Sequence, residues 1–521
     1  MNNFDSIIIG SGINSLVAAA ILSKNGKKPL ILERNEWVGG CIKTEELTLP
    51  DFIHDELAGW HPLFVTSPGY AELEEDLKRH GLTYVSTDIP TGVVLPDGNS
   101  AVLYNNREKN IENFNQLMPG DGDAFDQAMS EFQENADMVF SLLSNNVQSW
   151  TVIKQVIKRY RQQGMRDFRL NVGSMLESAR DLLESRFESK ELKALLAPWI
   201  LHTGLGPDDT AGSIMLQVLA FSLEQANMPV PKGGGISLVN ALSAIIKENG
   251  GEILTNKKVD KILTENNKVQ GVQVENETYY APYVLANVTP NQLYEDLLPV
   301  ETLDDAIVKS TRNFKYGNAG MQIHYALSDQ LDWENEELKR AALINLTSGI
   351  ESISASVNEA ANGLIPKEPT IAVGQHSVLD PSRAPEGKHT LWIQLLELPT
   401  ELRGDALGEI DTKNGYTDEV VDATAQRVEE RISRHAKNFK DIILDRKTVS
   451  PKKLEQYNPN LVGGNPYAGE AKIDQLLLWR PNGFTKSHET IITNLYHIGA
   501  STHPGPGLNG TSGYLAAKSI L

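Results

Sequence analysis

The first thirty-three residues contain a strand, a glycine-rich turn, a helix and a second strand, and this order constrains the fold more than any other feature. Ser6–Ile9 is a short run rich in β-branched residues, which is typical of a buried parallel strand. Gly10–Gly12 follows as a turn, and the small apolar residues of Leu16–Leu22 predict a helix. Pro29–Leu32 is the next strand, with Glu33 at its end. The pattern predicts a parallel sheet covered by helices.

The residues of this turn have the spacing of a dinucleotide-binding fingerprint. Glu33 stands 21 residues after Gly12, close to the distance at which an acid meets the ribose of a bound dinucleotide. Gly10 permits the tight turn, and Gly12 lets a pyrophosphate approach the backbone at the helix N-terminus. The third glycine position holds Ser15, which is small enough for close packing of helix on strand. We expect Arg34, next to the acid, to contact the same ligand.

A second glycine pair indicates which dinucleotide is bound. Gly39-Gly40 lies six residues after Glu33 and suits a loop that folds back over the same pyrophosphate. It resembles the motif of flavoproteins in the glutathione-reductase-like FAD superfamily, in the branch of amine oxidases and phytoene desaturases. That family usually has arginine where this chain has Cys41, and we expect Lys43 to make the phosphate contact instead.

The resemblance continues to the end of the chain. A Pro-x-Gly-Gly turn and the predicted helix Ile236–Asn249 precede a β-meander predicted over 252–287, in which the position of Val259 holds the adenine through its backbone in phytoene desaturases. The predicted strand Leu495–Ile498 enters a turn over Gly499–Gly510 and then a helix over Thr511–Ile520, which in the family is directed at the flavin. The loop 380–389 resembles that of desaturase-type carotenoid ketolases, although by physics alone it is a rigid turn.

These matches predict an α/β protein with a discontinuous FAD-binding Rossmann domain and an interleaved α+β substrate or cap domain. The 521 residues exceed the usual size of one domain. We assign 1–70, 228–299 and 473–521 to the FAD domain, and 71–227 and 300–472 to the other. Within the cap, helices are predicted over Ala71–Arg79, Ala124–Leu143, Thr151–Gln162, Leu176–Ser185 and Ala211–Gln225, and strands over Tyr325–Leu327, Thr370–Val373 and Leu391–Leu398.

The resemblance implies tightly bound, non-covalent FAD. The turn after the last strand also carries Ser501, where many relatives have an acid. The predicted cofactor-binding residues are Gly10, Gly12, Ser15, Glu33, Arg34, Gly39, Gly40, Lys43, Ala58, Gly59, Trp60, Val259, Gly499, Ser501, Gly507, Leu508, Asn509 and Gly510.

The motifs define the expected chemistry. Only one dinucleotide cradle is present, so we expect the organic substrate to reduce the flavin, NAD(P)H not to reduce it, and a quinone or oxygen to reoxidise it. His503 and His61 are the candidate acid–base residues, each with a structural hydrogen-bonding role as its alternative. His202, beside Trp199, is a weaker candidate in the cap. No histidines have the spacing of metal ligands.

The best interpretation is an FAD-dependent dehydrogenase or desaturase that removes hydride from an apolar, isoprenoid- or lipid-like substrate. A flavin amine oxidase is the alternative enzyme, and a non-catalytic FAD-binding scaffold is the alternative from another class. The formal net charge of −20 argues against nucleic acid as a partner, since phosphate binding needs clustered basic residues.

Localisation follows from what the chain lacks. The first residues show no signal peptide, and no apolar stretch approaches the ~20 residues that span a bilayer. We therefore expect a cytoplasmic protein. One segment, Thr151–Leu170, carries six basic residues against Asp167 alone, with apolar residues at helical spacing. Two interpretations stay open: an interfacial helix on the inner face of the membrane, or a cap helix packed on the core.

Overall fold

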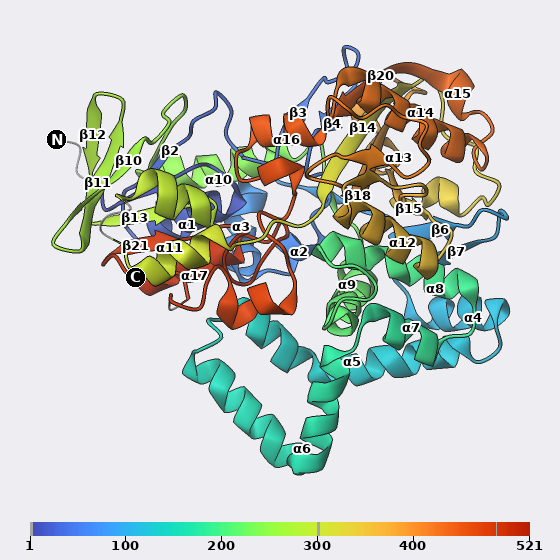
Figure 1. The fold of residues 1–521 in the computed structure, drawn as a ribbon, viewed down its shortest axis with the longest axis horizontal. Helices are drawn as coiled ribbons and strands as arrows, with labels where there is room; N and C mark the ends of the chain where they lie inside the picture. Colours follow the sequence, from blue (N-terminus) through green and yellow to red (C-terminus); the bar gives the residue numbers. More distant parts are fainter. Residues whose placement is uncertain (1–3, 300–302, 486) are drawn as a thin grey trace.

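The computed structural model describes residues 4–299, 303–485 and 487–521, and its first sheet joins segments from both ends of the chain. Five parallel strands follow the order β21-β13-β1-β2-β9 (Figure 1). Their bounds are β1 Ser6–Ile9, β2 Pro29–Leu32, β9 Glu252–Leu254, β13 Tyr283–Ala286 and β21 Leu495–His497. The order reverses beside β1, and ligands of open parallel sheets bind outside the carboxyl ends of the strands at such a point.

Closely packed helices cover this sheet. They are α1 Ile13–Lys24, α3 Pro68–Arg79, α10 Ile236–Glu248 and α17 Thr511–Ile520. Ten of the twelve residues of α1 are buried, which explains its small apolar composition. At the crossing of α1 and α17, a Cβ on Gly513 would lie 1.7 Å from the carbonyl oxygen of Asn14, so only glycine fits there. The last helix is thereby held against the first.

The predicted meander is shorter than expected. The antiparallel strands β10 Lys261–Glu265, β11 Lys268–Val274 and β12 Glu277–Tyr280 form it. The segments predicted over 252–255 and 284–287 are instead β9 and β13 of the parallel sheet, and Leu285 pairs with Ile8. In β13, Val284–Ala286 are buried, as expected for a strand covered on both faces.

A second, mixed sheet of seven strands forms the other half of the molecule, in the order β20-β14-β18-β17-β15-β6-β7. The bounds are β6 Thr91–Val94, β7 Ser100–Leu103, β14 Ala319–Leu327, β15 Leu343–Leu346, β17 Ile371–Gly374, β18 His389–Leu398 and β20 Ile443–Val449, with helices α12 Ile350–Ala361 and α14 Asp418–Ser433. The prediction of a mainly helical segment over 70–227 missed β6 and β7. These short strands are placed by a partner distant in the chain, since Thr91 pairs with Leu343.

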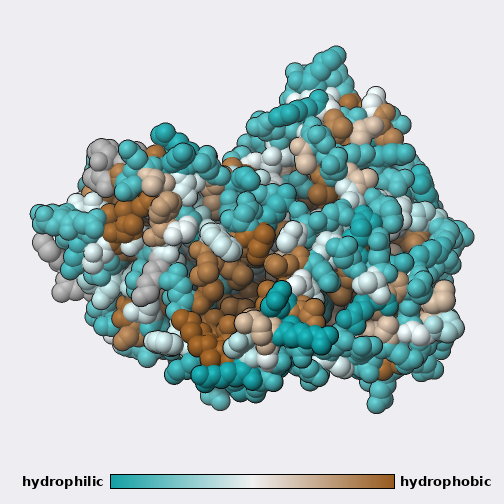
Figure 2. All heavy atoms as spheres, turned by 60° about the horizontal axis from the view of Figure 1, so that its bottom comes forward, coloured by the Kyte–Doolittle hydropathy of each residue, from teal (hydrophilic) through white to brown (hydrophobic). Residues whose placement is uncertain are grey.

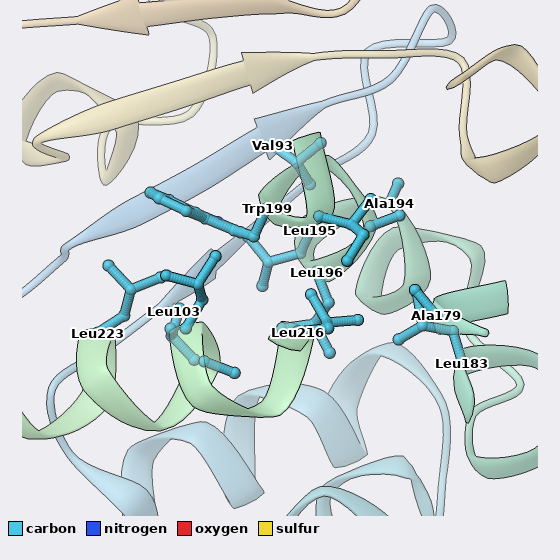
Figure 3. Close-up of a cluster of buried hydrophobic side chains, with 14 of the residues drawn as sticks. Val93, Leu103, Ala179, Leu183, Ala194, Leu195, Leu196, Trp199, Leu216 and Leu223 are labelled. Carbon is cyan, nitrogen blue, oxygen red and sulfur yellow. The ribbon is translucent and has the colours of Figure 1, made fainter. Parts of the chain in front are cut away.

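A helical cap lies beside this sheet. It contains α4 Arg107–Leu117, α5 Asp121–Ser144, α7 Ala179–Arg186, α8 Lys190–Leu196, the 3₁₀ helix η1 Ala197–Thr203 and α9 Gly212–Ala226. Leucines and alanines of these helices pack on side chains from β6 and β7 (Figure 3). The indole of Trp199 extends away from the other labelled side chains of this cluster. The cap core thus continues into the second sheet.

Helix α6, Trp150–Leu176, projects from the cap as a bent arm at the bottom of Figure 1. Gly164, with φ of 77°, interrupts it between two helical halves. Val152 is its single buried residue, whereas Ile153 and Ile157 are 38% and 42% exposed. Most of its apolar stripe is therefore not packed on the core, although Val152 is buried and Met175 packs against a cluster of α5 and α9. No helix in the described part of the chain combines the length and apolar character that crossing a membrane requires.

Shorter elements complete the connections. They are β3 Thr44–Glu45, β4 His54–Asp55, β5 Tyr84–Val85, β8 Val230–Pro231, β16 Leu364–Ile365, β19 Gly404–Asp405, α2 Pro62–Val65, α11 Asp305–Arg312, α13 His376–Leu379, α15 Phe439–Ile442 and α16 Pro451–Tyr457. The predicted domain boundary at residue 300 lies outside the described residues.

Candidate active site

A cavity of about 970 Å³ lies between the two sheets and the cap. One end, at the carboxyl edge of the parallel sheet, is lined by Gly10, Gly12, Glu33, Arg34, Gly39, Gly40, Val259 and Asn287. The middle is lined by Ala58, Gly59, Ser501, Gly507 and Leu508. The other end, which we call the chamber, is lined by Trp60, Leu63, Trp199, His202, Leu219, Met228, Gln322, Leu343, Trp392, Gln394 and Tyr467. Thirteen of the eighteen predicted cofactor residues line this one cavity.

Glycine backbones form a cradle at the parallel-sheet end. Gly12 caps α1 without a side-chain hydrogen bond, so the first N–H groups of the helix remain available to an anion. Gly12 forms an isolated β-bridge with Gly39, and a Cβ on Gly40 would lie 2.9 Å from the Cα of Gly12. The two glycine loops therefore meet at a spacing that side chains would prevent, and the concavity fits a pyrophosphate.

Glu33 is held at the end of β2 by three donors. Its Oε2 accepts hydrogen bonds from the N–H and the hydroxyl of Ser11 at 2.8 and 2.7 Å, and its Oε1 accepts one from the N–H of Asn35 at 2.8 Å. The side chain is buried against the turn that Gly10 and Gly12 open. This arrangement orients the carboxylate before a ligand arrives, which suits recognition of ribose hydroxyls.

The five other predicted cofactor residues do not line the cavity. The amine of Lys43 bonds Glu56 at 2.8 Å and Glu45 at 3.0 Å, and lies 4.7 Å from the ring centroids of Trp37 and Tyr457. With these partners, Lys43 does not reach a phosphate in the cradle, because the chain's own carboxylates hold its charge.

The remaining four residues are Ser15, Gly499, Asn509 and Gly510, which contact neighbours of the cavity-lining residues. The hydroxyl of Ser15 accepts a hydrogen bond from Asn287, and the N–H of Gly499 donates to Ser512. Asn509 accepts a hydrogen bond from the N–H of Thr511 at the start of α17, where Gly510 is the N-cap.

Asn287 is a lining residue that the sequence motifs did not indicate. It follows β13, and its amide donates to Ser15 at 2.9 Å. A Cβ on Gly499 would lie 2.3 Å from its Oδ1 and one on Gly12 would lie 3.2 Å from its Nδ2, so these glycines make room for it. Its position at the carboxyl end of a strand was the available signal.

The two predicted catalytic histidines lie outside the cavity lining, which corrects that prediction. Nδ1 of His61 is 3.0 Å from the hydroxyl of Tyr84. Nε2 of His503 is 3.0 Å from the carbonyl oxygen of Asn145, and its ring borders a separate small pocket. Burial lowers the pKa of each to about 4, so both are neutral at pH 7.

The chamber has aromatic walls and few polar groups. Trp60 lies 4.0 Å from His376 and 6.4 Å from Trp392, measured between ring centroids. His202 and Tyr467 are the titratable side chains among its described lining residues, and no acid or positively charged residue is among them. Such a surface fits a largely apolar molecule.

The 380–389 loop does more than the rigid turn that its sequence indicated. Arg383 is fully buried, and its guanidinium donates to Asp55 at 2.6 Å and to the carbonyl oxygen of Pro231 at 2.8 Å. Asp55 also accepts a hydrogen bond from the N–H of Gly235 at 2.7 Å. The loop therefore ties the second sheet to the segment that leads into the cradle.

Fold and cavity together define the class: an α/β dinucleotide-binding protein in which a separate sheet and a helical cap enclose the space beside the cradle. Residues 16–518 match the model of the flavin-containing amine oxidoreductases, and the chain belongs to this family. It is accordingly an FAD-dependent oxidoreductase. The described residues contain no cluster suited to hold a metal ion.

Named relatives span almost the whole chain. It is 27% identical to pyridine nucleotide-disulfide oxidoreductase domain-containing protein 2 of Rattus norvegicus, over 99% of this chain and 93% of that protein. It is 24% identical to a limonene dehydrogenase chain of Castellaniella defragrans, over 99% and 94%. It is 25% identical to 1-hydroxycarotenoid 3,4-desaturase of a Flavobacterium species, over 96% of each chain.

Solved structures support the fold class. A cyclohexylamine oxidase from Brevibacterium oxydans superposes with a TM-score of 0.59 at 13% identity, over 99% of this chain and 98% of that one. An oxidoreductase from Methanosarcina mazei gives 0.58 at 17% identity, over 99% of both. The predicted FAD-binding α/β fold is thus confirmed.

Proposed function

We propose that this enzyme removes hydride from an apolar, isoprenoid-like substrate bound in the chamber. The observation that carries the proposal is the lining of the chamber. It consists largely of tryptophans and aliphatic side chains, and the lining residues that the structure describes there include no carboxylate. Two relatives named above act on limonene and a hydroxycarotenoid. A substrate dominated by hydrocarbon gains about 25 cal/mol for each Å² of apolar surface buried in such a site.

We propose that the cradle end of the cavity holds FAD non-covalently, with Gly12 and Gly40 against the pyrophosphate and Glu33 on the ribose. In this proposal Val259 meets the adenine, and Ala58, Gly59 and Leu508, which also line the cavity, border the flavin ring. When bound, FAD supplies the group that accepts a hydride. The chain's residues position the substrate beside it and exclude water from the chamber.

The chamber argues against an amine oxidase. A protonated amine is bound most strongly beside a carboxylate, since aromatic faces and neutral acceptors offset less of the free-energy cost of burying a cation. The described chamber residues provide aromatic faces but no acid. The structural likeness to a cyclohexylamine oxidase concerns the fold. We therefore propose oxidation of C–H bonds in a largely apolar substrate, with a quinone or oxygen as the acceptor that takes up the electrons.

Anaerobic mixing tests this function. Holoenzyme mixed with isoprenoids that carry allylic C–H bonds, limonene among them, should lose its visible flavin absorption, and a quinone or oxygen should restore it. NADH and NADPH should not bleach the flavin at catalytic speed, because the sequence carries a single cradle. Putrescine and cyclohexylamine serve as controls. Bleaching by the amines without bleaching by any isoprenoid would contradict the proposal.

We propose further that α6 docks on an anionic membrane surface, where an apolar substrate is dissolved. Six basic residues lie on α6: Lys154, Lys158, Arg159, Arg161, Arg166 and Arg169. None of the six forms an ion pair with a residue that the structure describes, and Trp150, Met165 and Leu170 are 71%, 57% and 63% exposed. Figure 2 brings this side of the molecule forward and shows hydrophobic surface gathered in its central hollow.

Vesicle co-sedimentation measures this docking. The variant Lys154/Lys158/Arg159/Arg161→Glu should bind vesicles of anionic lipid at least a hundredfold more weakly than wild type at low salt, since each basic residue near the surface contributes about 1 kcal/mol. The control is Arg312/Arg403/Lys413/Lys437→Glu, whose side chains are 68%, 70%, 87% and 77% exposed on other elements. Equal partitioning of both variants, with the fold intact, would exclude α6 as the docking element.

A further inference from the structure

We infer that the chamber contains a polar subsite, formed by His202, Gln394 and Gln322, that binds a neutral oxygen group on an otherwise apolar substrate. This inference rests on the proposed function, because it concerns the molecule that occupies the chamber. The ligand class is an isoprenoid alcohol, aldehyde or ketone rather than a pure hydrocarbon.

His202 is the first member of the subsite. It lies on η1 three residues after Trp199, and their ring centroids are 4.9 Å apart with an interplanar angle of 31°. The Trp199 indole extends out of the leucine cluster of the cap (Figure 3), and both side chains line the cavity. The His202 ring makes no hydrogen bond with any residue that the structure describes.

The protonation state of His202 defines what it offers to a ligand. Burial lowers its pKa to about 4, so the imidazole is neutral at physiological pH. A neutral imidazole has one N–H donor and one acceptor nitrogen. It therefore matches a hydroxyl, which both donates and accepts, or a carbonyl, which accepts.

The two glutamines lie side by side on neighbouring strands. Gln322 of β14 is directly opposite Gln394 of β18 in the antiparallel register, so their side chains share one face of the sheet. Trp392, two residues before Gln394, points to the same face and lines the same cavity. This places the two carboxamides on the chamber wall.

Neither carboxamide is fully satisfied by the protein. Nε2 of Gln322 donates to the carbonyl oxygen of Leu57 at 3.0 Å, but its Oε1 is buried without a partner, and the residue is 5% exposed. The side chain of Gln394 makes no hydrogen bond within the described part of the chain. Gln394 thus carries an unused donor and acceptor on the chamber wall, and Gln322 Oε1 is an unpaired acceptor that lies beneath the accessible surface.

Such groups favour an oxygen-bearing ligand for a physical reason. Polar groups that remain unpaired when water is removed destabilise the complex, and a hydrocarbon leaves all of them unpaired. A hydroxyl or carbonyl pairs with them. A carboxylate lacks a counter-ion, because no lysine or arginine lines the described chamber. The subsite therefore selects neutral oxygen functions.

A pair of matched ligands tests the subsite. We would titrate the FAD-loaded enzyme with farnesol and with farnesene, a hydrocarbon of the same chain length, and follow tryptophan fluorescence and the flavin spectrum. Wild type should bind the alcohol at least tenfold more tightly than the hydrocarbon, a difference of about 1.4 kcal/mol. His202→Leu and Gln394→Leu should each reduce this ratio to within about twofold, and His202→Gln should retain part of it.

The control is Leu219→Met, which changes an apolar chamber residue without adding a hydrogen-bonding group and should leave the ratio unchanged. Flavin content and the thermal unfolding midpoint establish that each variant is folded. Equal binding of alcohol and hydrocarbon by wild type, or an undiminished ratio in both leucine variants, would overturn the subsite while leaving the apolar-substrate proposal intact. If neither ligand bound, the proposed function would fail together with it.

Discussion

Gly12→Val should yield a folded protein that carries no FAD. A Cβ at position 12 would approach the amide of Asn287 to 3.2 Å, and Gly40 packs so closely on the Cα of Gly12 that its own Cβ would lie 2.9 Å away. The two methyl groups of valine would therefore extend into the concavity that we assign to the pyrophosphate. Because that contact joins both halves of the dinucleotide, we expect at least a hundredfold loss of affinity.

The measurement is the FAD content of purified protein, read from the supernatant after acid precipitation. Wild type should release its FAD into the supernatant, as non-covalent binding requires. Gly173→Val is the matched control, because a Cβ on Gly173 meets nothing within 4 Å and the residue lies on the exposed α6. A normal flavin load in Gly12→Val would refute the assignment of the cradle, whereas a yellow pellet from wild type would indicate covalent attachment.

Arg383→Met should strongly destabilise the folded protein. It removes the cationic partner of Asp55, and both side chains are fully buried. Loss of one partner from a buried pair costs about 3–5 kcal/mol in the free energy of unfolding, because the other charge is left uncompensated. The control Arg403→Met removes an exposed pair with Glu401 and should cost about 0–1 kcal/mol. Urea unfolding at pH 7 compares the two variants.

The stabilisation that Arg383 provides depends on pH, because it depends on the charge of Asp55. Burial raises the pKa of Asp55, but Arg383 and the donated hydrogen bonds outweigh burial and lower the pKa to about 2. In wild type the pair therefore stabilises the fold above pH 4 and loses this effect as the pH falls toward 2. Without Arg383, burial dominates, the pKa of Asp55 rises, and the variant is penalised most at neutral pH.

The stability difference between wild type and Arg383→Met should consequently shrink between pH 7 and pH 4. Asp55→Asn/Arg383→Met, which removes both charges of the Asp55–Arg383 pair, should recover part of the loss. The recovery should be incomplete, because buried Asp380 also loses Arg383, whose Nε lies 3.3 Å from its Oδ2, and keeps only hydrogen bonds from Gly233 and Ser382. A constant difference across this range, or no recovery in the double variant, would show that Arg383 does not stabilise the fold through its charge pairing with Asp55.

The sequence by itself determined those features that depend on neighbouring residues. The strand–turn–helix of residues 6–24, the acid at Glu33 and the helix Thr511–Ile520 follow from glycine positions and from short apolar runs. Spacing along the chain encodes them, because a turn and the helix it opens are local structures. The family resemblance, carried by motifs of the same kind, predicted the cofactor correctly.

Only the tertiary structure decided which side chains face the cavity. β6 and β7 join the second sheet through a partner more than two hundred residues away, and the loop of Arg383 gains its partner Asp55 across the molecule. His61 and His503 turn to Tyr84 and Asn145, whereas His202 faces the chamber. The direction of a side chain depends on long-range packing, which residue spacing does not encode. For the same reason the sequence did not decide whether α6 packs on the core or projects from it, because its amphipathic pattern fits both arrangements.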